Sequence, residues 1–376
     1  MDLLACSGKQ GRPLRQENQL LCGSLALFDS SYCSFSRERI SDMIRYQWLD
    51  IIRGLLATTV VGLHAFWFNN LRGWFGDSQM AVNAFIVLSG FVITLLLVRR
   101  PESYGTFITR RLFRLMPVYL ICFGLALALR PLWVGTVAFE APREATENAY
   151  YWGHVINHLG MTFGVVPDFV LPNSSAALLP PAWSIGLELQ LYLVAPFIVA
   201  LLAKPAGWRL LAISLCVLIP QIHSRAYEWS KMGAFLPQKL YLFIAGALLF
   251  TYWPKLGSWP VPRMLSPLVW LGQISYPIYL VHYPLVALIN AYLPLGTGPV
   301  TRAIVLLIIS LPPVILASWF LHRAVEKPFI QLGKRLTHKE SKPVTKPAVM
   351  ARRKPELVLV ALSVQRASED ILPKIM

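Results

Sequence analysis

The chain has 376 residues, of which 55% are hydrophobic and only 14% are charged, and its formal net charge is +16. A soluble protein of this length needs more charged residues to cover its surface, so the composition excludes an ordinary soluble domain. Binding of nucleic acid would need a soluble basic face, and the sequence has none, so nucleic acid is not an expected partner.

The apolar residues come in long blocks, and crossing a bilayer takes roughly 20 such residues. We therefore predict an all-α, polytopic transmembrane helical bundle with eight to ten spans. Two blocks are short enough to be broken or tilted helices, and segment 152–166 is the weakest candidate for an additional span, because two histidines and an asparagine interrupt it. The eight blocks are residues 51–70, 80–98, 115–134, 184–203, 208–222, 240–253, 268–293 and 302–322.

Charge in the connecting segments predicts the orientation, because lysine and arginine in short loops favour the cytoplasmic side. Segment 99–114 carries five arginines, and the chain from Arg323 onward is also basic. An even number of spans with both termini in the cytoplasm places these two segments inside. The net positive charge is then explained by this bias and by the basic tail.

The ends of the chain are predicted to be disordered cytosolic tails, over residues 1–44 and 336–376, on either side of a transmembrane domain over 45–335. Residues 1–44 lack the pattern of a signal peptide, and Met43 is an alternative start. The five cysteines show no CxxC spacing, and those of the N-terminal tail fall in a reducing compartment. Neither a disulfide framework nor a metal site is expected.

Among the ionisable side chains inside predicted spans, His64, Glu188 and His282 are candidates for a function. Such groups are costly at membrane depth and usually face a cavity or a partner. A neutral histidine can also simply form a hydrogen bond between two helices. Both interpretations stay open for Glu188 and His282 taken alone, whereas the position of His64 carries more information.

Arg53 and His64 lie 11 residues apart in the first span. In an α-helix this spacing is three turns and about 16 Å of rise, so both side chains lie on nearly the same face. Such a face can hold an anionic cytosolic molecule at one end and carry out acid–base chemistry at the other. Asp50 precedes Arg53 by one turn and can orient its guanidinium. The alternative for Arg53 is an interfacial anchor that extends its charge to the headgroups.

Arg111 and Arg114 are also one helical turn apart. They are either determinants of membrane orientation, together with Arg110, or a fork that binds phosphate. A cytosolic coenzyme A thioester carries several phosphates and would suit such a fork.

Six segments occur in the order that is typical of the acyltransferase-3 family of integral membrane acyltransferases, and the chain resembles that family across residues 50–330. Leu189 stands where the family often has a second glutamate, so no second carboxylate is expected there. The segments are LDIIRGLLATTVVGLH (Asp50, Arg53, His64), FIVLSGFVI (Ser89, Gly90, Phe91), FITRRLFRLMPVYL (Arg111, Arg114), WSIGLELQLYLVAP (Trp183, Ser184, Glu188, Tyr192), ISYPIYLVHYPL (Ser275, Tyr276, Tyr279, His282) and VEKPF (Val325 to Phe329).

The resemblance implies a membrane O-acyltransferase, most often an O-acetyltransferase, of the bacterial inner membrane. It would move an acyl group from acetyl-CoA or another acyl-CoA to a hydroxyl of a carbohydrate. Typical acceptors are exopolysaccharides, O-antigens and signalling oligosaccharides, some of them lipid-linked. The expected partners are thus the bilayer, acyl-CoA and a glycan, with no permanently bound cofactor.

The roles follow from the same resemblance. We predict His64 as the general base, or alternatively as a residue that is transiently acylated, and Glu188 as the second catalytic group. The predicted donor-binding residues are Arg53, Arg111 and Arg114. The predicted substrate-binding residues are Asp50, Trp183, Ser184, Tyr192, Ser275, Tyr276, Tyr279 and His282.

Two other classes of protein also bury polar groups in membrane spans. A transporter of a glycan or small molecule often shows two similar halves, and the sequence has no internal symmetry of this kind. A non-catalytic scaffold would not need the polar positions of all six segments. We therefore favour the enzyme and keep the transporter as the alternative.

Overall fold

The computed structural model describes residues 46–71, 78–99, 102–134, 146–203, 229–253, 259–294 and 298–337, with residue 256 and a few positions between 210 and 218. Within these residues the fold is all-α, as predicted, and the only strand-like feature is an isolated bridge between Phe163 and Val166. The elements are α3 (Gln47–Trp67), α4 (Ser78–Arg99), α5 (Tyr104–Trp133), α7 (Tyr151–Gly160), α8 (Ala182–Leu202), α10 (Leu236–Tyr252), η2 (Arg263–Leu265), α11 (Ser266–Gln273), α12 (Ser275–Tyr292), α13 (Pro299–Leu321), the π-helical turn η3 (His322–Glu326) and α14 (Lys327–Thr337).

The long apolar helices confirm a membrane bundle. Five of them are long and apolar enough to cross a bilayer, and the bent pair formed by α11 and α12 is a sixth candidate. Helix α10 has 17 residues, and α7, which overlaps segment 152–166, has only 10. At 1.5 Å per residue, α7 is about 15 Å long and cannot cross a bilayer alone.

The finer predictions on topology are not settled by these helices. The expected span 208–222 falls largely outside the described residues, so a count of eight to ten stays a prediction. The tails predicted over 1–44 and 336–376 also lie outside them, except that α14 ends at Thr337. The cytoplasmic location of both termini is likewise a prediction.

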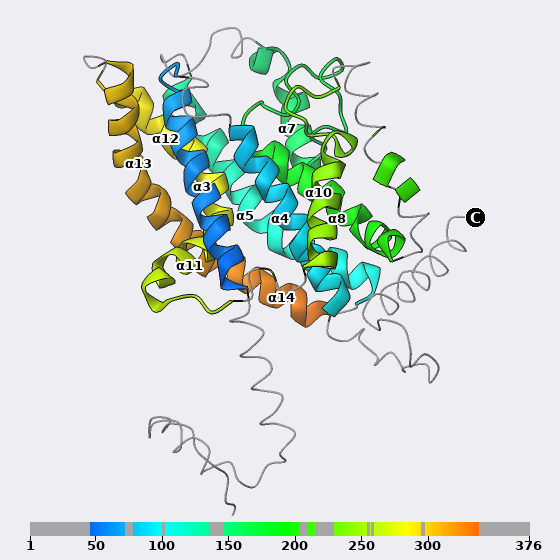
Figure 1. The fold of residues 1–376 in the computed structure, drawn as a ribbon. Coiled ribbons are helices and arrows are strands. Elements are labelled where there is room, and N and C mark those ends of the chain that lie inside the picture. Colours follow the sequence, from blue (N-terminus) through cyan, green and yellow to red (C-terminus); the bar gives the residue numbers. More distant parts are fainter. Residues whose placement is uncertain are drawn as a thin grey trace, which may run out of the picture.

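Close helix contacts bring the ends of α3 and α11 together (Figure 1). Gly54 and Gly272 face each other at this crossing, and a Cβ atom placed on Gly272 would lie 1.9 Å from the carbonyl oxygen of Asp50. Only glycine allows the two backbones to approach so closely. This contact fixes the first turns of α3, including Arg53, against the segment that leads into α12.

A sharp break separates α11 from α12. Ile274 adopts φ −97° and ψ 7°, outside the helical range, and the axes of the flanking helical segments differ by 62°. The bend turns the first residues of α12 toward α5 and α8. Ser275, Tyr276 and Tyr279 reach the interior of the bundle for this reason.

Helix α7 and the irregular segment after it cover one end of the bundle, at the top of Figure 1. His158 joins this cover to α5, because its Nε2 donates to the carbonyl of Ala177 at 2.9 Å while its Nδ1 accepts from the hydroxyl of Tyr119 at 2.9 Å. The ring of Phe123 stacks on His158 at 4.4 Å. Burial lowers the pKa of His158 from its ordinary 6.5 to about 3, so this contact is made by a neutral imidazole.

The crossing of α3 and α11 predicts an effect of Gly272→Ala. The added Cβ would collide with the backbone of Asp50, and overpacking of this kind costs about 1–3 kcal/mol. We expect a lower unfolding temperature in detergent, measured by the loss of monodisperse protein on heating. Gly124→Ala is the matched control, because a Cβ there meets nothing within 4 Å in the exposed middle of α5. Equal unfolding temperatures for both variants would show that the crossing tolerates a wider separation.

Candidate active site

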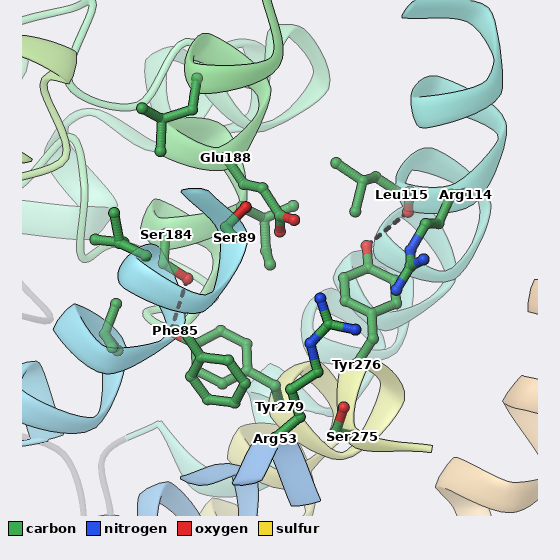
Figure 2. A pocket seen from close by; sticks show the side chains of 14 residues that line it. Arg53, Phe85, Ser89, Arg114, Leu115, Ser184, Glu188, Ser275, Tyr276 and Tyr279 are labelled. Carbon is green, nitrogen blue, oxygen red and sulfur yellow. Dashed lines mark hydrogen bonds between the residues drawn. The ribbon is translucent and has the colours of Figure 1, made fainter. Parts of the chain in front are cut away.

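Five helices, α3, α4, α5, α8 and α12, enclose a cavity of about 700 Å³, its open mouth included (Figure 2). The polar and aromatic lining residues come from different helices, so the cavity exists only when the bundle is assembled. These residues are Arg53, Phe85, Ser89, Arg114, Ser184, Glu188, Ser275, Tyr276 and Tyr279.

The charged lining consists of two guanidinium groups and one carboxylate. Arg53 interacts electrostatically with Arg114 as well as with Asp50 and Glu188. Among the lining residues that the structure describes, Glu188 is the only carboxylate. The lining residues themselves hold two cations and one anion, and this local excess of positive charge favours an anionic ligand, while Asp50 and Glu326 compensate part of it from behind the wall.

Hydrogen bonds hold the two lining tyrosines of α12 in place. The hydroxyls of Ser184 and Tyr279 lie 2.8 Å apart, which ties α8 to α12 across the cavity. The hydroxyl of Tyr276 donates to the backbone carbonyl of Leu115 at 2.7 Å, within α5. Figure 2 shows both contacts as dashed lines. Because each bond joins two helices, the cavity walls are fixed relative to one another.

The two arginines of the predicted fork occupy different surroundings. Arg114 lines the cavity, whereas the guanidinium of Arg111 lies over the rings of Phe107 and Tyr192, at 5.7 Å and 5.8 Å from their centroids. The hydroxyl of Tyr192 donates to Glu188, so the ring that Arg111 covers also holds the carboxylate of the cavity wall, and Arg111 itself is not a lining residue. The Nε of Arg111 is buried and has no hydrogen-bond partner among the described residues.

The two predicted histidines form a pair. The ring centroids of His64 and His282 lie 5.0 Å apart, and the ring of His282 lies 6.1 Å from that of Tyr279. Each Nδ1 faces a carbonyl one turn earlier in its own helix, Val60 at 2.9 Å and Ile278 at 3.1 Å. Since a carbonyl only accepts, each neutral ring carries its proton on Nδ1 and a lone pair on Nε2. The Nε2 of His282 is fully buried and has no partner within the described part of the chain.

Neither histidine lines the cavity, and Asp50 and Trp183, like Arg111 and Tyr192, also lie outside its wall. Asp50 lies in the first turn of α3 and interacts electrostatically with Arg53 and Arg114. Trp183 is buried beside the lining residue Ser184. Asp50 is thus placed behind the charged wall, and Trp183 packs in the bundle.

Two groups near the site were given no role from the sequence. Phe85 and Ser89 line the cavity from α4, within the segment FIVLSGFVI, whose resemblance was noted without a function. Glu326 belongs to the segment VEKPF and is 3% exposed. It accepts a hydrogen bond from His322 Nδ1 at 2.7 Å and interacts electrostatically with Arg114. The segment resemblance was the available signal in both cases.

Comparison with known proteins identifies the class of this bundle and cavity. Residues 46–268 match the model of the acyltransferase-3 family, which is described as an acyltransferase domain. The match covers more than half of the chain, so the chain belongs to this family of membrane acyltransferases. It is therefore a multi-pass membrane enzyme.

Several relatives support the assignment at low identity. The O-acetyltransferase OatA of Staphylococcus aureus is 22% identical over 378 residues, which cover 79% of this chain and 59% of OatA. BcsY of Komagataeibacter xylinus, named as a candidate membrane-bound transacylase, is 27% identical over 58% of this chain and 52% of its own length. The chain thus spans about three fifths, or less, of the curated relatives that it matches. No solved structure gives a significant match.

The charge balance of the cavity predicts the behaviour of Glu188→Gln. Without this carboxylate the two lining guanidinium groups face each other with less compensation, so the empty protein should unfold at a lower temperature than the wild type. An anion that binds the folded cavity stabilises it by mass action. Added coenzyme A should therefore raise the unfolding temperature of this variant more than that of the wild type. Ser184→Ala, which keeps all three charges, is the control; an equal response in both variants would contradict this account.

Proposed function

We propose that this protein is a membrane O-acyltransferase that transfers an acyl group, most often acetyl, from acyl-CoA to a hydroxyl of a carbohydrate. Family membership supports acyl transfer, and the name of OatA supports transfer of acetyl to oxygen. The observation that carries the proposal is the pairing of a cationic cavity with two histidine rings 5.0 Å apart in the same bundle. The bacterial relatives favour a bacterial inner membrane and a surface glycan, lipid-linked or free, as the acceptor.

The donor site of the proposal is the cationic cavity. Arg53 and Arg114 offer planar donors that match phosphate oxygens, and their excess charge over Glu188 suits the polyanionic part of coenzyme A. The distribution of lysine and arginine in the loops favours an orientation in which this end of the bundle faces the cytosol. The pantetheine arm would then extend along α3 from Arg53 toward His64, over the three turns that separate them.

The chemical step needs a base, because a sugar hydroxyl is too weakly acidic to attack a thioester unaided. His64 Nε2 would take the hydroxyl proton while the oxygen forms a bond to the carbonyl carbon. The carbon–sulfur bond then breaks, and the thiolate of coenzyme A leaves and receives a proton. The bond from Nδ1 to the Val60 carbonyl would hold the ring in the tautomer that leaves Nε2 basic.

The alternative is a covalent acyl-histidine, in which His64 Nε2 itself attacks the thioester. The two routes differ in one observable. Membranes incubated with labelled acetyl-CoA and no acceptor would leave label on the protein only if an acyl-enzyme forms. Absence of such label together with transfer to added glycan would favour the general base.

The proposal is tested by His64→Gln. Glutamine can still donate to the carbonyl of Val60 but cannot accept a proton, so transfer of labelled acetyl to glycan should fall by roughly 10²–10⁴-fold. The amount of protein in the membrane should not change. Leu63→Ala is the control in the same helical turn. A His64→Gln enzyme with near-normal transfer would exclude both chemical roles, and a wild-type chain that moves glycan without acylating it would point to the transporter.

The different positions of the two arginines predict different effects of the same substitution. Lysine keeps the charge but loses the planar fork. We expect Arg114→Lys to raise the donor KM by about tenfold or more, since one lost charge-assisted contact is worth at least 1.4 kcal/mol. Arg111→Lys should raise it less, because Arg111 stacks on Phe107 and Tyr192 outside the cavity. Initial rates at varied acetyl-CoA separate the two, and equal increases would restore both residues to one phosphate fork.

A further inference from the structure

The last described helix, α14, runs across the end of the bundle instead of along it (Figure 1). It follows the apolar helix α13 after the short π-helical turn η3, and one side of it packs on α5. Arg110 Nε donates to the hydroxyl of Thr337 at 2.8 Å. Gly333 lies against Phe113, so closely that a Cβ on this glycine would be 2.8 Å from the Cβ of Phe113. These contacts fix which side of α14 is docked.

The two remaining sides of α14 have opposite character. Successive residues turn by about 100° in an α-helix, so the side chains sort into stripes on either side of the docked one. One stripe is apolar and exposed by 39%, 41% and 57%, and consists of Phe329, Leu332 and Leu336. The stripe on the other side of the docked surface, away from the apolar stripe, is exposed and basic, and consists of Lys327, Lys334 and Arg335.

A helix with this division lies in the plane of a membrane interface, with its apolar side among the acyl chains and its cations at the headgroups. The position of α14 meets the same condition, because it continues directly from a helix long and apolar enough to span the bilayer. Three cations on the polar side complement anionic lipids. A lipid bilayer therefore accounts for all three features: acyl chains cover the apolar stripe, anionic headgroups contact the basic stripe, and the helix lies at the interface.

We infer that α14 is an interfacial helix that binds anionic lipid at the end of the bundle that carries Arg110 and Arg114. Phe329, Leu332 and Leu336 enter the acyl-chain region, and Lys327, Lys334 and Arg335 contact the anionic headgroups.

The same helix supports the proposed donor site. The docked side of α14 contacts Arg110 and Phe113 of α5. Glu326, which is buried just before α14, interacts electrostatically with Arg114 in the cavity wall. Seating of α14 on lipid therefore favours the arrangement in which Arg114 lines the cavity. This second part rests on the proposed function, whereas the lipid contact itself does not.

The depth of α14 is measured with nitroxide labels in the full-length chain, with its five native cysteines replaced by serine and with proven membrane insertion. Labels are introduced as Leu332→Cys and Lys334→Cys. In vesicles that contain phosphatidylglycerol, the label at 332 should respond severalfold more to oxygen than to a water-soluble nickel chelate, and the label at 334 should do the reverse. A label at 332 that responds to nickel as strongly as the one at 334 overturns the inference. So does a label at 332 shielded from both, since protein would then cover the stripe.

Lipid dependence is measured without any cysteine change, as the donor KM in vesicles with and without phosphatidylglycerol. The wild type should show a KM at least threefold lower with the anionic lipid, and Lys334→Gln combined with Arg335→Gln should remove the difference. Lys231→Gln, an exposed lysine outside α14, should keep it. A wild-type KM that ignores lipid charge overturns the link between α14 and the donor site. A chain that transfers no acyl group defeats the proposed function instead, while the nitroxide result stands.

Discussion

The structure depends on one electrostatic constraint, which is the placement of two half-buried guanidinium groups and a half-buried carboxylate inside a bundle of apolar helices. Charges in such surroundings are tolerated only when they are compensated nearby. Arg53, Arg114 and Glu188 come from three different helices, α3, α5 and α8, and meet at one cavity. The close crossing at Gly272 places the first turns of α3, and the bend at Ile274 separates α11 from α12, which lines the same cavity.

The cavity and the histidine pair are parts of one arrangement because α12 contributes to both. Tyr279 faces the cavity and is held by Ser184, and His282 follows it by about one turn and contacts His64. A movement of α12 would therefore change the donor cavity and the histidine pair together. The geometry suits an elongated donor that enters beside the arginines and ends near the imidazoles, which is the order that the proposed acyl transfer needs.

Two predicted site residues, Arg111 and Asp50, lie outside the cavity and contact residues of its wall or their neighbours. Arg111 stacks on Tyr192, whose hydroxyl holds Glu188, and Asp50 lies behind Arg53. These residues would affect ligand binding by orienting the side chains of the cavity wall. Buried networks of this kind fix one arrangement of the side chains, since an unpaired member is costly.

The sequence by itself determined the membrane class and the family, and it singled out most of the polar residues that line the cavity, because apolar block length and ordered motifs are local properties. Helical periodicity also placed Arg53 and His64 on one face of α3. Only the tertiary structure decided that Arg114, and not Arg111, enters the cavity, and that His64 meets His282. The spacing along one helix says which residues share a face, but the neighbour of that face is set by helix crossings and bends, such as the 62° break before α12, that arise from packing between distant segments.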